Sequence, residues 1–331
     1  MSSSQEDRLL QWLREQLHGD GSDRLGDDAA LLPRAETAIT VDHQIAGVHF
    51  PTGLDPRVVA QRLLAVNLSD LAAMGAEPRY AFLALSSPPD QDMKSFLQAL
   101  LKATRDAGVE LAGGDLARGP VLSATLTLVG GKVPGGRWVR RSTGKPEDRL
   151  WLGGPVGQSA LGRHLLEGGA DFQSSRIQLP PELASDRGLA TAAREAIRRH
   201  LFPDPQIDLG RWLARRRRAA AIDISDGLSL DLHRLCRESG VGARLHSESL
   251  PTTTRFLDLC AWLELRPLDL ELSGGEDYCL LFSLPATIRP PDSYGCTHVG
   301  ELTRDRSIRL IEGGGVRLLE PQGWDHLRTT E

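Results

Sequence analysis

The sequence predicts a mixed α/β fold, because segments with strand-like and helix-like patterns alternate along the chain. Its 331 residues, of which 40% are hydrophobic, suffice for two domains with sizeable cores. Aromatic residues make up only 5%, so Leu, Val, Ala and Ile must fill those cores. There is no run of 18 apolar residues, and we therefore expect no membrane span.

In the first half, we expect helices over 6–17, 55–78 and 90–107, and strands over 37–42, 79–87 and 119–133. Residues 6–17 are amphipathic, and the strand "TAITVD" ends on an acid. Pro56 suits the first turn of the helix over 55–78, and Gly75 and Pro78 are expected to end it.

Turn residues in "TGKPEDRLWLGG" are followed by a new strand, which predicts two domains, 1–144 and 145–331. The second half opens with a strand and the helix in "GPVGQSALGRHLL". We then expect helices over 181–200 and 206–217, a strand, acidic turn and helix over 219–240, a strand over 276–284, and short final strands.

The net charge of −5 argues against a nucleic-acid partner. The four arginines at 215–218 are more simply explained as cations at a helix C-terminus. The first residues contain no continuous apolar stretch typical of a signal peptide. Four cysteines, none in a CxxC pair, are expected to be free thiols in the cytoplasm: Cys236, Cys260, Cys279 and Cys296.

Acidic residues recur at the ends of apolar segments and in glycine-containing turns. They are Asp27, Asp28, Asp42, Asp70, Asp115, Asp223, Asp226, Glu276 and Asp277. Each alone is explained as a turn residue or helix N-cap, and Asp28 and Asp226 fit N-caps well. Together, without matching cations nearby, they favour a bound hard cation, Mg²⁺ rather than Zn²⁺. Mg²⁺ commonly shares its coordination shell with phosphates, so a phosphorylated ligand is also expected.

The glycines in "LAGGD" are able to form a phosphate-binding loop or an ordinary turn. No P-loop motif or protein-kinase signature occurs in the sequence. Asn67 and Asp70 share one face of an apolar helix, as a buried satisfied pair or as ligands, and we favour a ligand role for Asp70.

Eight motifs, in this order, resemble those of the thiamine-monophosphate kinase family, from about residue 6 to about 327. They are "GDDAALL", "ITVDHQIAGVHF", "AVNLSDLAAMGAEP", "LAGGD", "RRSTGKPED", "IDISDGLSLDL", "LSGGEDYCLLF" and "GWDHL". The resemblance implies the AIR-synthetase-like fold: an N-terminal α/β domain that forms a barrel across a homodimer, and an α+β C-terminal domain. It also implies phosphoryl transfer from ATP to thiamine phosphate, with several Mg²⁺ ions.

Site residues follow from the same resemblance. The implied metal ligands are Asp28, Thr40, Val41, Asp42, Asp70, Asp115, Asp223 and Asp226, of which Asp70, Asp115 and Asp226 are expected to be catalytic. ATP-binding positions are Gly114, Asp115, Arg141 and Ser225, and substrate-binding positions are His49, Glu276 and Trp324. Asp27 is expected to support its turn. The family usually has a hydroxyl residue where this chain has Val41, which offers only its backbone carbonyl.

The chemistry needs no dedicated general base, because the second pKa of a phosphate monoester is about 6 and the attacking oxygen is already ionised. Arg141 suits a forked contact to phosphate, although a surface ion pair is its alternative. One alternative function is a sibling enzyme such as selenophosphate synthetase or AIR synthetase. The former needs a reactive Cys near the N-terminus, and the first 235 residues contain none. The other is a Mg-nucleotide-binding regulator without turnover.

Overall fold

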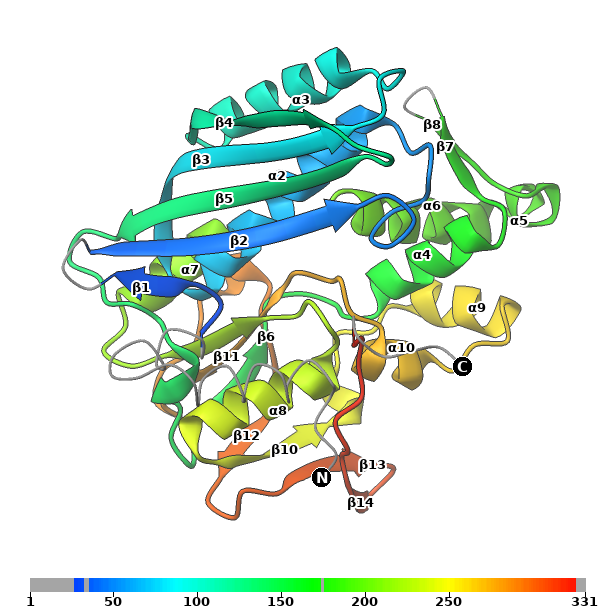
Figure 1. The fold of residues 1–331 in the computed structure, drawn as a ribbon. Coiled ribbons are helices and arrows are strands. Elements are labelled where there is room, and N and C mark those ends of the chain that lie inside the picture. The colour runs from blue at the N-terminus through cyan, green and yellow to red at the C-terminus, as the bar shows by residue number, and fades with distance from the viewer. Residues whose placement is uncertain (1–26, 33–35, 174–175, 326–331) are drawn as a thin grey trace.

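The computed structural model describes residues 27–32, 36–173 and 176–325, which fold into a mixed α/β arrangement around two main sheets (Figure 1). The α/β class predicted from the sequence is therefore confirmed. The helix predicted over 6–17 lies outside the described residues. Within the described ranges, no helix combines the length and the apolar character that a membrane crossing requires.

The first sheet has five strands in the order β1-β2-β5-β3-β4, and two helices pack against it (Figure 1). Its elements are β1 (Ala30–Leu32), β2 (Thr37–Ile45), α2 (Pro56–Ala73), β3 (Ala76–Ser87), α3 (Met93–Asp106), β4 (Glu110–Arg118) and β5 (Ser123–Lys132). All pairings are antiparallel except β3 with β4. The opposite face is open: Val41 on β2 and Tyr80 and Phe82 on β3 are exposed there.

Helix α2 begins as predicted, with Pro56 in its first turn and the Asp55 side chain accepting from the Arg57 N–H over 2.9 Å. It ends at Ala73, just before Gly75, whose φ of +60° is readily adopted by glycine. Pro78 does not end the helix. It lies in β3, where a register shift against β5 accommodates the residue that lacks an N–H.

The "LAGGD" segment is a strand, and neither the predicted loop nor the ordinary turn forms there. Gly113 to Asp115 lie inside β4 and pair in register with β3. The glycine is required by close packing of the two strands, because a Cβ on Gly114 would lie 2.0 Å from the carbonyl oxygen of Leu83. A short, glycine-rich sequence has no pattern that indicates an edge strand or its parallel partner.

The second sheet is formed by seven strands in the order β14-β13-β10-β12-β6-β11-β9. The elements of this half are β6 (Arg149–Leu152), α4 (Gln158–Glu167), β7 (Asp171–Gln173), β8 (Arg176–Gln178), α5 (Pro181–Ser185), α6 (Arg187–Leu201), α7 (Ile207–Ala214), β9 (Ala220–Asp223), α8 (Leu228–Ser239), β10 (Gly242–His246), α9 (Thr254–Trp262), α10 (Pro267–Ser273), β11 (Leu280–Leu284), β12 (Thr297–Thr303), β13 (Ile308–Glu312) and β14 (Gly315–Leu318). The short 3-10 helices are η3 (Arg141–Thr143), η4 (Ser247–Ser249) and η5 (Asp292–Tyr294).

Several predicted elements of this half are shorter than expected. The helix over 181–200 is divided into α5 and α6, because the Asp186 side chain caps a new helix by accepting from the N–H groups of Gly188 and Leu189. Helix α7 stops at Ala214, so the four arginines follow its C-terminus as predicted. The strand over 276–284 is regular only from Leu280.

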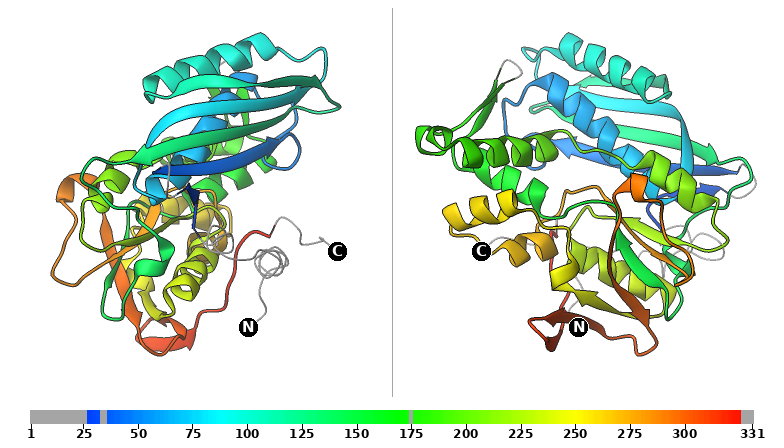
Figure 2. Two further views of the ribbon diagram at one scale, coloured as in Figure 1. Left: turned by 60° about the vertical axis from the view of Figure 1, so that its left-hand side comes forward. Right: turned by 180° about the vertical axis from the view of Figure 1, so that it is seen from behind.

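Helix α2 lies between the two sheets and contacts both, β2 and β5 on one side and β9 and β11 on the other (Figure 2). One hydrophobic core joins α2 and the first sheet to α4, α6 and α9, and a second lies between α8 and the second sheet. The predicted division at 144/145 falls between the two sheets and stays a prediction. The position of α2 determines where acids from both halves of the chain meet.

Candidate active site

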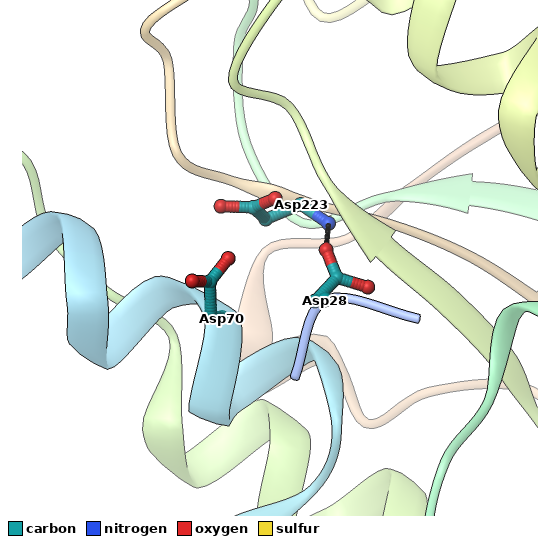
Figure 3. A group of neighbouring side chains, drawn as sticks. All are labelled: Asp28, Asp70 and Asp223. Carbon is teal, nitrogen blue, oxygen red and sulfur yellow. Dashed lines mark hydrogen bonds between the residues drawn. The ribbon is translucent and has the colours of Figure 1, made fainter. Parts of the chain in front are cut away.

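Three carboxylates from distant parts of the sequence meet where α2 faces the second sheet (Figure 3). Asp28 precedes β1, Asp70 lies in the last turn of α2, and Asp223 ends β9. One oxygen from each lies within 4.8 Å of the others. Asp28 also accepts a hydrogen bond from the backbone N–H of Asp223 over 3.3 Å, which links the two segments directly.

Strand β2 adds Asp42 to this group and places Thr40 beside it. We call Asp28, Asp42, Asp70 and Asp223 the acid cluster. The hydroxyl of Thr40 donates to Asp70. The backbone N–H of Asp42 donates to Asn67 over 3.2 Å. Alternation along β2 points the side chains of Thr40 and Asp42 towards α2 and the side chain of Val41 to the open face. The side chain of Val41 therefore points away from the acid cluster.

Asn67 is a buried structural residue. Its side-chain oxygen accepts from β2, and its amide donates to the carbonyl of Leu63 over 2.8 Å. The other polar residue beside the cluster, Ser69, donates to Asp223 over 2.6 Å. Of the polar pair noted on this helix face, Asp70 alone therefore belongs to the acid cluster.

Burial and mutual repulsion raise the pKa values of Asp42, Asp70 and Asp223 in the acid cluster. Burial raises the pKa of Asp42 to about 6, with the neighbouring carboxylates of Asp226 and Asp28 adding to the effect. Burial, and then repulsion by neighbouring carboxylates, raises the pKa of Asp70 and of Asp223 well above the usual range. Several close oxygen ligands that repel one another suit a hard divalent cation such as Mg²⁺.

Arg141 contacts the acid cluster directly, through Asp28. Its Nε donates to Asp28 over 2.9 Å, and the Asp28 side chain is completely buried. The preceding residues, Asp27 and Arg140, form a similar pair. Asp27 accepts from Arg140 Nε over 2.8 Å and from the backbone N–H of Arg141 over 2.8 Å. Asp27 therefore fixes the position of η3, as expected of a residue that supports its turn.

The Asp226 side chain is not a helix N-cap, and neither is that of Asp28. Asp28 precedes a strand, while the cap residue of α8 is Gly227, without a side-chain bond. Asp226 instead accepts from Arg234. Ser225 and Asp226 form the turn between β9 and α8, next to the acid cluster.

Two of the three predicted substrate residues, Glu276 and Trp324, adjoin the turn through their backbone N–H groups, and His49 lies close enough to Glu276 to affect its pKa. Glu276 pairs with the buried Arg62 of α2 and lies 3.6 Å from the ring Nδ1 of His200. Although burial opposes it, Arg62 and further cations including His49 lower the pKa of Glu276. The Trp324 indole is 43% exposed and lies 5.6 Å from the guanidinium carbon of Arg163. This contact shows that the indole face accommodates a cation.

Gly114 and Asp115 are the predicted site residues that the chain does not bring to the cluster. Both lie on β4, the edge strand farthest from β1 and β2 in the sheet order. Asp115 pairs with Ala84, on the open face, whereas Asp42 points to the opposite face. Within the described part of one chain, the predicted site is therefore incomplete.

Sequence reasoning missed three residues that support the site: Arg62, Asp231 and Arg234. Asp231 and Arg234 are buried, and both contact the turn at 225–227. Asp231 lies within the motif "IDISDGLSLDL", so its apolar surroundings were a signal for a buried, hydrogen-bonded acid. Arg62 offered no comparable signal, because a single arginine in a helix is usually at the surface.

Comparison with known proteins identifies the family. The family model described as "AIR synthase related protein, N-terminal domain" matches residues 26–131. Thiamine-monophosphate kinase of Salmonella typhimurium is 37% identical over 321 residues, covering 92% of each chain. The solved structure "AaThiL complexed with AMPPCP and TMP" superimposes with a TM-score of 0.83 at 27% identity, over 97% of both chains.

A second solved structure, thiamine-monophosphate kinase from Stenotrophomonas maltophilia K279a, has a TM-score of 0.71 at 32% identity. It covers 92% of this chain and 94% of its own. The resemblance seen in the sequence motifs is thus confirmed over nearly the whole length. The chain belongs to the thiamine-monophosphate kinase family.

Proposed function

We propose that this protein transfers the γ-phosphoryl group of ATP to thiamine phosphate, giving thiamine diphosphate and ADP. The observation that carries the proposal is the buried acid cluster, in a chain whose relatives are thiamine-monophosphate kinases. The solved relative bound to AMPPCP and TMP supports the two substrates. A terminal phosphate oxygen of thiamine phosphate forms the new P–O bond, the β–γ bridging P–O bond breaks, and ADP leaves.

The acid cluster together with Asp226 is proposed to hold Mg²⁺. When bound, the cation neutralises charge on the phosphates and stabilises the transferring group. The chain itself supplies three things: carboxylates held by α2, β2 and β9, the Arg141 guanidinium for the ATP phosphates, and Ser225 in the adjoining turn. The acceptor phosphate is already ionised near neutral pH, so no residue is required to remove a proton.

His49, Glu276 and Trp324 are proposed to bind the thiamine part of the substrate. A positively charged thiazolium ring suits the exposed indole face of Trp324, and Glu276 adds a carboxylate of complementary charge. His49 Nδ1 accepts from the backbone N–H of Ile45 over 3.1 Å, which leaves Nε2 as the nitrogen that carries the proton.

We also propose that the active unit is a homodimer formed through the open face of the first sheet. Val41, Tyr80 and Phe82 are exposed there, on two strands that both pair with β5. A second copy is the simplest source of an Asp115 close to the acid cluster, because the chain's own Asp115 lies on the far edge strand and on the opposite face. The four free cysteines support placing this activity in the reducing cytoplasm.

The test of function is incubation with ATP, Mg²⁺ and thiamine phosphate, followed by chromatography for thiamine diphosphate and ADP in equal amounts. Free thiamine should give no product, since its hydroxyl would need a base. ATP binding without any ADP would instead indicate a regulator, and product formation from free thiamine would refute the acceptor assigned here.

A mixing experiment tests the shared site. Asp70→Asn and Asp115→Asn should each be inactive. If one site takes Asp70 from one copy and Asp115 from the other, the mixed dimer contains one intact site, and random reassortment should restore about a quarter of wild-type activity. Activity that stays at zero on mixing, with mixed dimers verified by mass spectrometry, would contradict the shared arrangement.

A further inference from the structure

The turn between β9 and α8 is built on one buried carboxylate. A single oxygen of Asp231 accepts hydrogen bonds from three consecutive backbone N–H groups, those of Ser225 at 3.2 Å, Asp226 at 3.1 Å and Gly227 at 3.1 Å. The Asp231 side chain is inaccessible to solvent. Gly227 makes the backbone of this turn flexible, and the three hydrogen bonds to one oxygen hold it in a single conformation.

The other oxygen of Asp231 connects the turn to a metal-ligand candidate. It accepts from Arg234 Nη1 over 3.0 Å, and the same nitrogen donates to the carboxylate of Asp226. Arg234 is therefore shared between a carboxylate that fixes the turn and one that faces the site. The position of the Asp226 carboxylate is thus set from two directions, through its own backbone and through Arg234.

The outward side of the turn holds two residues of the proposed thiamine site. The carbonyl of Ser225 accepts from the backbone N–H of Glu276 over 2.7 Å, and the carbonyl of Asp226 accepts from that of Trp324 over 2.9 Å. These segments are about 50 and 100 positions further along the chain, and they meet at two adjacent peptide groups.

Two glycines show how closely these segments approach the turn. A Cβ on Gly275 would lie 2.8 Å from the carbonyl oxygen of Ser225, and one on Gly323 would lie 2.5 Å from that of Asp226. Gly275 also has a φ of +70°, which favours glycine. Any larger residue at either position would push Glu276 or Trp324 away from the turn.

We propose that Asp231 is a positioning residue for both substrates at once. It fixes a turn whose side chains, those of Ser225 and Asp226, are proposed to bind ATP and the metal. The carbonyls of the same turn hold Glu276 and Trp324, which are proposed to bind thiamine phosphate. The inference rests on the proposed function for the names of the two substrates. If Asp231 only stabilised the start of α8, its loss would lower stability and leave both KM values unchanged.

The experiment compares Asp231→Ala and Asp231→Asn with the wild-type protein. In the alanine variant, the KM for ATP and the KM for thiamine phosphate should rise together, each by about tenfold or more, because three charge-assisted bonds to the turn are lost. Asparagine keeps an oxygen acceptor but places its NH₂ towards Arg234, so the rise should be smaller. Backbone hydrogen exchange in the 223–230 segment should become faster in the same order.

Asp148→Asn is the matched control. Asp148 is also buried, accepts from a turn N–H, that of Lys145, over 2.9 Å, and pairs with Arg218. Its replacement should lower the melting temperature while both KM values stay within about twofold of wild type. A comparable rise of both KM values in this control would mean that any lost buried carboxylate has the same effect, and would overturn the proposal.

The inference also fails if the Asp231 variants fold and show wild-type exchange at 223–230, or if only one KM changes. Should the alanine variant not fold, the asparagine variant decides by the same two measurements. Lack of thiamine diphosphate formation by the wild-type protein would refute the proposed function instead. The exchange comparison needs no turnover, so the two failures are distinguishable.

Discussion

Arg141 Nε donates to the buried carboxylate of Asp28 over 2.9 Å, which joins a proposed ATP ligand to a proposed metal ligand. The guanidinium can keep this bond and still direct its terminal nitrogens elsewhere. A lysine at 141 has a single charged nitrogen and cannot do both. If Arg141 binds ATP as proposed, the pair connects the nucleotide with the acid cluster.

Replacing Arg141 by Lys should raise the KM for ATP about tenfold or more and leave the KM for thiamine phosphate nearly unchanged. The matched control is Arg140→Lys, because Arg140 pairs with Asp27 in the same way but is more exposed. Steady-state kinetics with each substrate varied in turn measures both constants. Equal effects of the two substitutions on ATP would contradict a direct role for Arg141.

Asp70→Asn should have opposite effects on activity and on stability. Activity should fall by at least about a hundredfold, because a ligand charge is lost from the cluster. Without Mg²⁺, the free energy of unfolding should rise by about 1 kcal/mol, since one of several mutually repelling buried carboxylates becomes neutral. Urea unfolding in the presence of a chelator checks the second effect. A stability loss as large as that of a core truncation would indicate a structural role instead.

The stability of the protein without Mg²⁺ should fall as pH rises. The pKa of Asp42 is about 6, above its unfolded value of about 3.9. The folded state therefore binds the proton more tightly, and this contribution to stability is lost between about pH 4 and pH 6. Saturating Mg²⁺ favours the ionised acids, so it should raise the melting temperature more at pH 7 than at pH 5. Equal shifts at both values would show that these acids do not bind the ion.

Trp324→Ala should mainly raise the KM for thiamine phosphate. The loss of one cation–π contact corresponds to about 0.5–2 kcal/mol, or roughly two- to thirtyfold. Trp324→Phe should recover part of the loss, because a π-face remains. The KM for ATP should barely change. If Trp324 only covered the core, the melting temperature would fall and both KM values would stay at wild type, and that result would remove it from the substrate site.

Gly323→Ala tests how the indole is held. A Cβ at this position would lie 2.5 Å from the carbonyl of Asp226, so the segment that carries Trp324 must move. We expect a higher KM for thiamine phosphate, close to that of Trp324→Ala. Gly315→Ala is a suitable control, since neither glycine has a positive φ and the atom nearest to the Cβ added at Gly315, the carbonyl oxygen of Glu312, lies 3.4 Å away. A similar loss in the control would show that the close approach of Gly323 to Asp226 is not the cause.

The sequence predicted the elements whose signals are local. Pro56 marked the start of α2, and the acidic turn between an apolar strand and a helix was recognised at β9 and α8. It failed at β4, because a glycine-rich edge strand carries little strand propensity and is defined by its partner β3. Pro78 misled for the same reason: the register shift that admits it depends on β5.

The candidate site shows the same division between local and distant information. The acids were identifiable one by one, since each interrupts an apolar segment. The sequence did not indicate which of these acids meet, because the docking of α2 between two sheets brings Asp28 and Asp223 together. The sequence also did not indicate that Arg62 pairs with Glu276 or that Asp231 accepts from the 225–227 turn, because only the fold brings these residues together.

The docking of α2 between the two sheets also determines when the acid cluster can form. Asp28 and Asp223 are 195 positions apart, and the strand β9 is synthesised long after the first sheet is complete. A nascent chain therefore contains Asp28, Asp42 and Asp70 without Asp223 until β9 has been made, and the acid cluster is completed late in synthesis. The electrostatic cost of adding Asp223 to the other carboxylates falls on the docking of the second sheet, and Mg²⁺, if it binds the acid cluster as proposed, would stabilise the folded chain at that step.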